Sequence, residues 1–288
     1  MERPQSVYEA ICAEQGLAFR RHGDAITLQG PLQAGTFRVR GDISSQFITG
    51  LLLALPLLDA DSRIELIPPV ESRSYLNITV EALESFGVSA VWEGEYALRV
   101  PGGQSYAPRD VTVEGDYSNA AFFSALEMLG DPVTVTGLGR SAQGDRIYQD
   151  YFPLLKAGHP TLDVTDCPDL APILMALSAA LNGCVLTGTR RLKIKESDRG
   201  TAMEQELRKL GANCVIEADQ IAVFPGIHAP AEPLCGHNDH RIVMALSVLL
   251  TRVGGVIRGA EAVSKSFPDF FEQLKNLKIE VIHHAAGQ

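Results

Sequence analysis

Four stretches of the chain are apolar on nearly every side of a helix, and an Asp precedes each of them. A helix that is apolar all round is buried in a domain core, so these stretches predict buried helices. Asp is a favourable N-cap because its carboxylate accepts hydrogen bonds from the free N–H groups of the first helical turn. We therefore predict buried helices over 44–58, 118–130, 171–183 and 241–255, opened by Asp42, Asp116, Asp169 and Asp239.

Each apolar stretch is followed by a short strand and then by an amphipathic helix. The strands are predicted at 63–67, 133–138, 184–189 and 255–260, and the second helices at 72–87, 144–158, 196–211 and 266–277. The four Asp residues lie between 53 and 74 residues apart, which exceeds the period of a solenoid repeat. The pattern therefore predicts an α+β (α/β) fold in which one block of helices and strands is repeated along the chain.

The first 30 residues fit only the second half of such a block. Residues 5–16 predict its second helix and residues 17–30 predict the hairpin that follows, but no apolar stretch precedes them. We expect the chain to begin partway through a block, with an incomplete domain of about one and a half blocks over 1–113 and three blocks over 114–288. The alternative is a divergent N-terminal cap over 1–30.

Composition narrows the function without deciding it. Hydrophobic residues make up 45% of the 288 residues and charged residues 21%, as in soluble globular proteins, and the longest apolar run (47–58) is interrupted by polar, Gly and Pro residues, which argues against a membrane span. The formal net charge of −10 argues against binding to nucleic acid or acidic membranes, although a few converging cations can still bind an anionic ligand. The five cysteines form no CxxC pair, so we expect free thiols in a cytoplasmic protein and no metal site.

Candidate chemistry gathers at the predicted helix N-termini, where free N–H groups and the helix dipole favour anions. Ser44, Ser45 and Gln46 open the first buried helix, and their side chains can bind a phosphate and a sugar-like hydroxyl. The alternative is that the serines only cap the helix. Asp169 stands at the mouth of the third buried helix, either as an N-cap alone or as a cap that also contacts substrate hydroxyls.

The segment 195–199, Lys-Glu-Ser-Asp-Arg, has four charged residues at the start of a predicted helix. Lys195 and Arg199 are four residues apart and can share one helix face, where Arg offers two parallel hydrogen bonds to an anion and Lys a point charge. Glu196 lies next to cations that can tune its pKa for proton transfer. The alternative for this run of charges is a solvated helix start.

Three more cationic or titratable residues lie near the fourth buried helix. His240 and Arg241 enter an apolar helix, which is unfavourable unless they face a ligand or a partner group. A core histidine with satisfied hydrogen bonds is the alternative for His240, and the adjacent Arg241 weakens it. Lys265 lies in the polar turn after the fourth predicted strand.

Four segments, SSQF (44–47), KESDR (195–199), NDHR (238–241) and SKSFPDFF (264–271), resemble in this order the signature segments of the 5-enolpyruvylshikimate-3-phosphate (EPSP) synthases. The resemblance extends from Arg3 to about Leu277. It implies a two-domain fold built from repeated βαβαββ units around buried helices, with the active site in the interdomain cleft. It also implies transfer of the enolpyruvyl group of phosphoenolpyruvate to the 5-hydroxyl of shikimate 3-phosphate, with release of phosphate and without a metal or organic cofactor.

The resemblance implies roles for individual residues. Asp169 resembles the acceptor of the 5-hydroxyl proton, Glu196 resembles a proton-transfer residue acting on the methylene carbon, and Lys265 is the third catalytic candidate. Contacts to shikimate 3-phosphate are implied for Ser44, Ser45, Gln46, Ser72, Tyr75, Asp169 and Lys195. Contacts to phosphoenolpyruvate are implied for Arg3, Gln46, Arg199, His240, Arg241 and Lys265. Arg191 stands where some family members have an Asn, so it receives no role.

The resemblance covers the C-terminal portion of the family's proteins, whose N-terminal segment supplies an essential Lys-Ser pair and an Arg. We therefore expect the isolated chain to have little or no activity and an N-terminal fragment, as a partner, to restore it. Two alternatives stay open at this point. One is the related enolpyruvyl transferase that acts on UDP-N-acetylglucosamine, which lacks the KESDR segment, and the other is a non-catalytic partner subunit.

Overall fold

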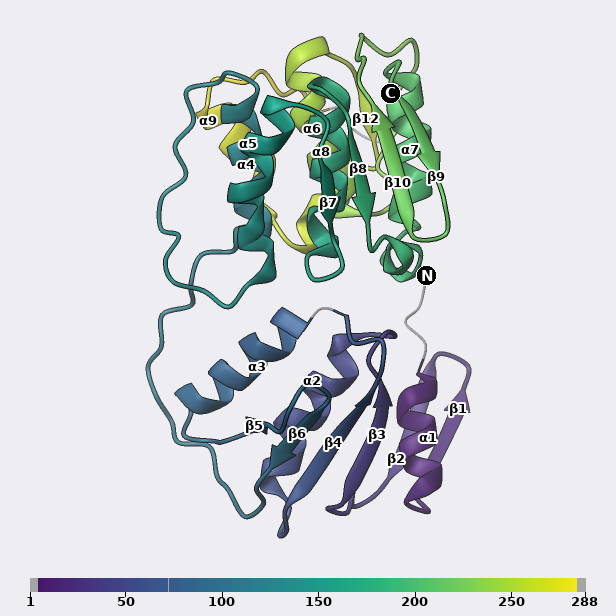
Figure 1. Ribbon diagram of the computed structural model, residues 1–288, viewed down its shortest axis with the longest axis vertical. Coiled ribbons are helices and arrows are strands. Elements are labelled where there is room, and N and C mark those ends of the chain that lie inside the picture. The colour runs from purple at the N-terminus through teal and green to yellow at the C-terminus, as the bar shows by residue number, and fades with distance from the viewer. Residues whose placement is uncertain (1–4, 72, 284–288) are drawn as a thin grey trace. The chain divides into compact units, whose positions relative to one another are not determined.

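The computed structural model describes residues 5–71 and 73–283. The chain divides into two compact units (Figure 1). The first comprises the described residues up to Val113 together with Ala142–Gly144, and the second comprises Glu114–Ser141 and the described residues from Asp145 onward. Both units combine helices with strands, which confirms the α+β class predicted from the sequence. Within the described residues, no helix is both long and apolar enough to cross a membrane.

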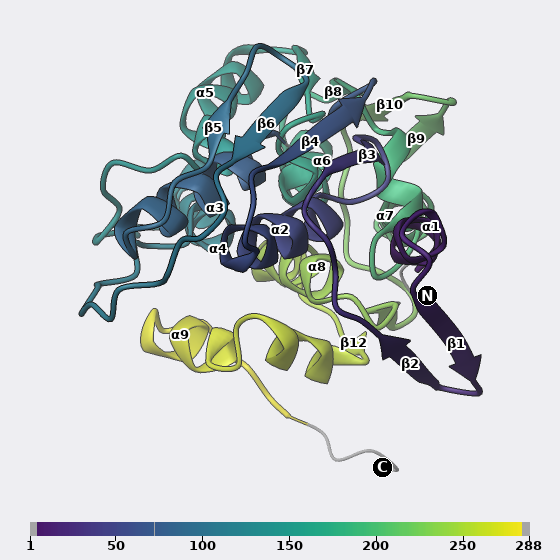
Figure 2. The ribbon, with the colours of Figure 1, turned by 90° about the horizontal axis from the view of Figure 1, so that it is seen from below.

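The first unit begins with a helix and a hairpin. Helix α1 (Ser6–Glu14) is followed by the antiparallel strands β1 (Ala18–His22) and β2 (Ala25–Gln29), as predicted for 5–30. In the described part of the chain these two strands pair only with each other, and every residue of β2 is exposed. Figure 2 shows the hairpin standing away from the four-stranded sheet of the same unit.

The rest of the first unit is a βαβαββ block. Its elements are β3 (Thr36–Arg40), α2 (Ser45–Ala54), the 3-10 helix η1 (Leu55–Leu57), β4 (Ser62–Ile67), α3 (Arg73–Ser85), β5 (Val91–Trp92) and β6 (Ala97–Val100). The strand order is β3-β4-β6-β5, with β3 parallel to β4 and the other pairs antiparallel. Side chains alternate between the two faces of a strand, so β3 buries Phe37 and Val39 in one core with Leu51 of α2 and Leu76 of α3.

The second unit contains a block with the same strand order and directions. Its elements are β7 (Thr161–Asp163), η3 (Pro168–Leu170), α6 (Ala171–Ala180), β8 (Cys184–Thr187), η4 (Arg190–Ile194), α7 (Arg199–Lys209), β9 (Asn213–Ile216) and β10 (Gln220–Phe224). The sheet order is β7-β8-β10-β9, and β7 and β8 are again the parallel pair. The repeat inferred from the sequence is therefore a repeat of structure for two of the four predicted copies, those that contain α2 and α6.

Two further segments belong to the second unit. Before the block come α4 (Tyr117–Met128), η2 (Gly144–Ile147) and α5 (Tyr148–Ala157); after it come β11 (Leu234–Cys235), α8 (His240–Val253), β12 (Ile257–Arg258), η5 (Ala260–Lys265) and α9 (Phe270–Asn276). Strands β11 and β12 form a parallel pair. The strand predicted at 133–138 is wrong. β propensity makes a strand only where a partner strand is available, and no described strand pairs with this segment.

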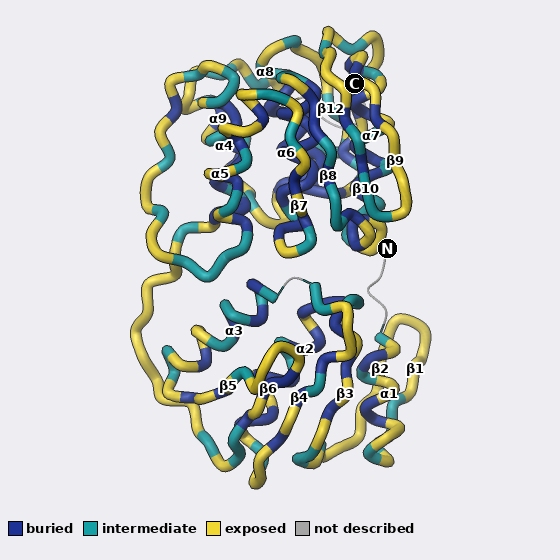
Figure 3. The backbone as a smooth tube through the Cα atoms, viewed as in Figure 1, coloured by how far each residue is buried: buried dark blue, intermediate teal, exposed yellow. Residues whose placement is uncertain are grey.

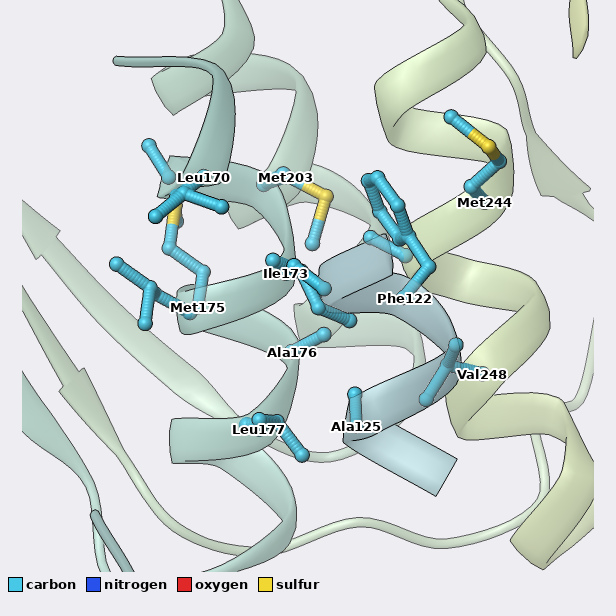
Figure 4. Packing of buried hydrophobic residues seen from close by; sticks show 14 of the residues in the cluster. Phe122, Ala125, Leu170, Ile173, Met175, Ala176, Leu177, Met203, Met244 and Val248 are labelled. Atoms are coloured by element: carbon cyan, nitrogen blue, oxygen red, sulfur yellow. The ribbon is translucent and has the colours of Figure 1, made fainter. Parts of the chain in front are cut away.

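Helices α6 and α8 form the centre of the second unit's core. Residues 171–179 and 240–249 are buried without exception, and the two helices lie against each other (Figure 3). Figure 4 shows Phe122 of α4, Ile173 of α6 and Met244 of α8 among the packed side chains. The prediction of buried helices is confirmed for these two stretches.

Helix α2 is not buried on all sides, so that prediction is wrong for the first stretch. Leu53 of α2 is 48% exposed, and Leu57 of η1 in the same predicted stretch is 55% exposed. The reason is the number of neighbours, because α2 packs on one sheet, on α3 and on Tyr8 of α1, whereas α6 contacts α4, α5, α7 and α8.

Two of the four predicted Asp caps are confirmed. The Asp116 carboxylate accepts a hydrogen bond from the backbone N of Asn119 (3.0 Å) at the start of α4. The Asp239 carboxylate accepts one from the backbone N of Arg241 (2.9 Å) at the start of α8. These bonds fix the direction in which each helix leaves its loop.

The caps predicted at Asp42 and Asp169 are wrong. Helix α2 is capped by Ser44, and Asp42 forms an ion pair with Arg40 (2.7 Å). Helix α6 begins two residues after Asp169, and the carboxylate of Asp169 is occupied by cationic side chains. In both cases a nearby cation binds the carboxylate more strongly than neutral N–H groups do.

The turn after β8 depends on a glycine. Gly188 has a φ of 71°, and a Cβ there would clash with Thr165 Oγ1 and lie 2.8 Å from Asp163 Oδ1. Asp163 holds Thr165 in place by accepting from its backbone N (2.8 Å) and its hydroxyl (2.6 Å). The two connections that lead to Asp169 and Lys195 therefore pack directly against each other.

Replacing Gly188 with Ala should destabilise the protein more than replacing Gly137 with Ala. Both glycines have positive φ, which costs a residue with a Cβ about 1–2 kcal/mol, but nothing lies within 4 Å of a Cβ built at Gly137. The clash at Gly188 should cost roughly 1–3 kcal/mol more. Urea unfolding followed by circular dichroism measures the difference, and equal losses in the two variants would contradict the close approach.

Candidate active site

The guanidinium of Arg199 lies at the centre of a buried charged cluster in the second unit. Asp198 caps α7 by accepting from the backbone N of Thr201 (3.2 Å), and Arg199 is the first residue of that helix, with a side chain only 1% exposed. Three carboxylates bind the guanidinium: Asp239 through Oδ2 at 2.9 Å and Oδ1 at 3.4 Å, Asp169 through Oδ1 at 2.6 Å and Glu196 through Oε2 at 2.8 Å. Hydrogen bonds between ionised groups are the strong ones, so these contacts fix Arg199 firmly.

Asp169 binds two further cations. Its Oδ1 lies 3.1 Å from Lys195 Nζ, and its Oδ2 lies 3.6 Å from Arg241 Nη2. The structure thus brings together the three segments that the sequence predicted separately, at the starts of α6, α7 and α8. Three cations (Lys195, Arg199 and Arg241) balance three carboxylates (Asp169, Glu196 and Asp239).

The groups of the cluster shift one another's pKa values. Burial by itself would raise the pKa of the Asp169 carboxyl, but Lys195, Arg199 and Arg241 hold it well below its usual range. Burial would likewise raise the pKa of Asp239, and Arg199 lowers it. Burial lowers the pKa of Lys195 against the opposing effect of Asp169. Asp169 is therefore ionised at neutral pH.

The first turn of α8 has buried polar atoms with unused hydrogen-bonding capacity. Arg241 Nη1 donates to Asn119 Oδ1 on α4 (3.1 Å). Arg241 Nε and His240 Nδ1 are buried, and neither has a hydrogen-bond partner in the described part of the chain. Buried polar atoms are nearly always paired, so these two indicate that a ligand binds at the start of α8. Burial, followed by the charge of Arg241, lowers the pKa of His240, so its ring is neutral at neutral pH.

Lys265 reaches the loop that precedes α8. It is the last residue of η5, and its Nζ donates to the backbone O of Asn238 and to Asn238 Oδ1 (2.7 Å). The sequence predicted a polar turn for Lys265, and the family resemblance implied a catalytic role and a contact with phosphoenolpyruvate. The structure places its ammonium beside the 238–241 segment, within the same unit as the charged cluster.

The candidates of the first unit lie on α2 and α3. Ser44 accepts from the backbone N of Gln46 (3.3 Å) as the N-cap of α2, so the capping alternative describes one contact that it makes. Ser45 is buried, Gln46 is exposed and Tyr75 of α3 is half-buried. Two predicted binding residues, Arg3 and Ser72, lie outside the described residues.

Sequence reasoning missed two residues of the cluster. Asn119 orients Arg241 from 122 positions away, and no local pattern around Asn119 indicates that contact. Asp239 was interpreted as a helix cap, but it also binds Arg199, and Ser197 donates to its Oδ2 (3.0 Å). The sequence did contain a signal for this role of Asp239. It directly precedes His240 and Arg241, and a carboxylate there can balance the charge of a buried arginine.

Two other features bear on the site's chemistry. Arg191 is buried, and its charge contributes to the lowered pKa of Lys195. Within 5–71 and 73–283, no group of three or more His, Cys, Asp or Glu side chains is arranged to hold a metal ion. The cluster is suited to binding a multiply charged anion and to moving protons through carboxylates.

Comparison with known proteins identifies a family. The sequence model of the family described as EPSP synthase (3-phosphoshikimate 1-carboxyvinyltransferase) matches residues 21–274. The 3-phosphoshikimate 1-carboxyvinyltransferase of Clostridium kluyveri is 36% identical over 310 aligned positions, which cover 100% of this chain and 73% of that protein. The enzyme of the same name from Brachyspira hyodysenteriae is 34% identical and covers 97% of this chain and 72% of its own length.

Solved structures share the fold. An EPSP synthase from Acinetobacter baumannii superimposes with a TM-score of 0.74 at 21% identity, covering 98% of this chain and 72% of that one. The enolpyruvyl transferase NikO from Streptomyces tendae gives a TM-score of 0.72 at 17% identity, covering 99% and 73%. At these identities the similarity establishes the fold and nothing further.

Replacing Asp169 with Asn should destabilise the protein at neutral pH, because it leaves three buried cations facing two carboxylates. Breaking a buried ion pair on one side costs about 3 kcal/mol. In the parent chain, the folded pKa of Asp169 lies below its unfolded value near 4, so its stabilisation is complete above pH 4 and is lost as the pH falls through the folded pKa. The variant should therefore also lose less stability between pH 4 and pH 2.

Urea midpoints measured from pH 7 to pH 2 test this expectation. Asp150, an exposed carboxylate on α5, provides the matched control, since its change to Asn should leave the curve unaltered. If the urea midpoints of the Asp169→Asn variant and the parent protein fell in parallel as the pH is lowered, the three cations would not be holding the carboxylate of Asp169 in its ionised form.

Proposed function

The chain belongs to the EPSP synthase family, and we propose that it transfers the enolpyruvyl group of phosphoenolpyruvate to the 5-hydroxyl of shikimate 3-phosphate, releasing phosphate. The observation that carries this proposal is the buried cluster around Arg199, together with the unused polar atoms of His240 and Arg241 at the start of α8. A substrate with carboxylate and phosphate groups supplies the hydrogen-bond partners that those atoms lack.

In the proposed reaction, two carboxylates have separate tasks. The Asp169 carboxylate accepts the proton of the 5-hydroxyl as the hydroxyl oxygen attacks C2 of phosphoenolpyruvate, and Glu196, in its protonated form in the substrate complex, delivers that proton to C3, the methylene carbon. As the C2–O bond to phosphate breaks, the resulting Glu196 carboxylate takes a proton back from C3, which gives the enol ether, and the proton on Asp169 leaves with the phosphate. Enzymes commonly divide acid and base roles between two carboxyl groups in different surroundings.

Substrate binding makes Asp169 a better base. Without ligand, Lys195, Arg199 and Arg241 hold the pKa of Asp169 well below its usual range, which weakens it as a proton acceptor. Anionic groups of the substrates compete for the same cations and thus relieve that effect. We assign Arg199, Arg241, His240 and Lys265 to phosphoenolpyruvate, with Arg3 and Gln46 as further contacts.

Shikimate 3-phosphate is assigned to both units. On the second unit Lys195 and Asp169 are its contacts, and on the first unit they are Ser44, Ser45, Gln46, Ser72 and Tyr75. Support for the contacts on the first unit comes from the ten-residue helix α2. The first turn of α2 carries hydroxyl and amide groups at a helix N-terminus, where backbone N–H groups favour anions. A cytoplasmic location, expected from the free cysteines, stays a prediction.

We also propose that full activity requires the portion of the family's proteins that this chain does not match, supplied by an N-terminal fragment. The chain covers 73% of the Clostridium kluyveri relative. Helix α1 with β1 and β2 repeats the αββ half of the block formed by β3 to β6, and within the described residues β2 has no further strand to pair with. An added βαβ segment would complete that block.

Replacing Glu196 with Gln should lower kcat by about 10²–10⁴-fold, because the amide cannot deliver a proton, while the affinity for either substrate changes little. Phosphate release at saturating substrates, with the N-terminal fragment added, measures kcat. Glu204 lies on the same helix and pairs with the exposed Arg208, so its change to Gln is the control and should leave kcat unaltered. A full rate in the Glu196 variant would remove that residue from the mechanism.

Adding the unmatched N-terminal portion of the Clostridium kluyveri enzyme as a separate fragment should raise the rate of phosphate release well above that of the chain alone. Calorimetry with shikimate 3-phosphate, with and without the fragment, reports binding independently of turnover. Rapid turnover by the chain alone, unaffected by the fragment, would disprove the need for a partner. Failure to bind shikimate 3-phosphate under either condition would disprove the enzymatic assignment.

A further inference from the structure

Glu206 is a buried carboxylate to which the proposed reaction gives no task. It lies on the inner face of α7 with a side chain only 2% exposed. Its Oε1 accepts from His237 Nε2 (2.9 Å), and its Oε2 accepts from the backbone N of Cys235 (2.9 Å) and lies 3.0 Å from Lys209 Nζ. A carboxylate is buried only when such donors replace water, so these contacts belong to a defined arrangement.

Helix α7 holds the loop before α8 at two points. Arg199 and Glu206 are seven residues apart, about two helical turns, and therefore share one face of α7. Arg199 binds Asp239 at the end of the loop, and Glu206 binds Cys235 and His237 at its beginning. The loop is thus fixed to a single rigid helix at both ends.

Between these two points the backbone is strained. His237 has a φ of 49° and Asn238 a φ of 53°, so two consecutive residues with side chains lie in the left-handed region. Among residues with side chains Asn is one of the few that adopts this region as a single residue, and two such residues in succession persist only where the surroundings hold them. The bond from the His237 ring to Glu206 lies directly at the strained pair.

The conformation of Asn238 determines where the ligand-binding cations stand. Its backbone O and its Oδ1 are both acceptors for Lys265 Nζ, and a relaxed backbone would turn the carbonyl away. The next residues are the α8 cap Asp239 and then His240 and Arg241. A shift of the loop would therefore displace three of the groups assigned to phosphoenolpyruvate.

We propose that His237 and Glu206 are positioning residues for phosphoenolpyruvate. They hold Asn238 in its left-handed conformation, and through it Lys265, His240 and Arg241, without touching the substrate themselves. This inference rests on the proposed function for the identity of the ligand, but the effect on the loop does not depend on it. Asp169 reaches the displaced groups through its 3.6 Å approach to Arg241 Nη2, which is longer than its 2.6 Å bond to Arg199. Binding of shikimate 3-phosphate should therefore change much less than binding of phosphoenolpyruvate.

The test uses the full chain with three substitutions of histidine. His237→Ala removes the contact with Glu206, and His237→Gln keeps an N–H donor at about the same reach. His228→Ala is the matched control, because that exposed histidine contacts the backbone O of Ala229 and not Glu206. Calorimetry gives the affinity of each protein for phosphoenolpyruvate and for shikimate 3-phosphate, and amide hydrogen exchange reports the backbone N–H groups of Asp239 and Arg241.

His237→Ala should weaken phosphoenolpyruvate binding by about tenfold or more, since small displacements of binding groups have large effects. Its affinity for shikimate 3-phosphate should stay within about twofold of the parent value, and exchange at Asp239 and Arg241 should accelerate. His237→Gln should restore both properties, and His228→Ala should change neither. Unchanged phosphoenolpyruvate affinity in His237→Ala, or an equal loss for both substrates, would overturn the proposal.

The two hypotheses fail in different ways. If the parent chain binds no phosphoenolpyruvate even with the N-terminal fragment added, but exchange responds to His237→Ala and is restored by His237→Gln, the proposed function fails and the positioning of the loop by Glu206 is supported. If exchange does not respond to His237→Ala, the positioning role fails whatever the substrates do.

Discussion

The second unit is organised around the guanidinium of Arg199, which is buried away from solvent. Arg199 is almost completely buried, and a buried cation persists only if anions and hydrogen-bond acceptors replace the solvent. Asp169, Glu196 and Asp239 do so from three different places, the approach to α6, the turn before α7 and the start of α8. The ion pairs of Arg199 therefore fix the starts of three helices relative to one another, and Lys195 and Arg241 both contact Asp169.

The same cluster connects stability with reactivity. In the ligand-free chain the carboxylates neutralise Lys195, Arg199 and Arg241, and this pairing holds the pKa of Asp169 well below its usual range. In the proposed reaction an anionic substrate competes for those cations, which weakens the internal ion pairs and frees a carboxylate to accept a proton. On this proposal, the charges that balance one another in the ligand-free site are redistributed when the substrate binds. Helix α7 contributes at both ends, since Arg199 organises the carboxylates and Glu206 holds the loop that carries His237 and Asn238.

The topology of the repeated block determines where a helix N-terminus lies, but the side chains at that position determine what it can bind. Sheets β3-β4-β6-β5 and β7-β8-β10-β9 have the same order and directions, and each has a helix that starts after its first strand. At that point the first block has a serine cap and an Asp paired with a surface Arg, whereas the second has Asp169 facing buried cations. Identical topology therefore supports a hydroxyl-lined helix start in one unit and an ionic cluster in the other.

The sequence by itself determined the block pattern, most helices and the segments that carry charge, because periodicity and composition are local properties. It identified 195–199, 238–241, Asp169 and Lys265 as chemistry-bearing, and the family resemblance agreed with the relatives found. It could not determine that 133–138 lacks a partner strand, that α2 keeps an exposed face, or that Asp169 is an ion-pair partner instead of a cap. Those outcomes, like the contacts of Asn119 with Arg241 and of Glu206 with His237, depend on which distant residues meet. Only the tertiary structure decides this, since pairing, burial and charge balance are settled by neighbours in space.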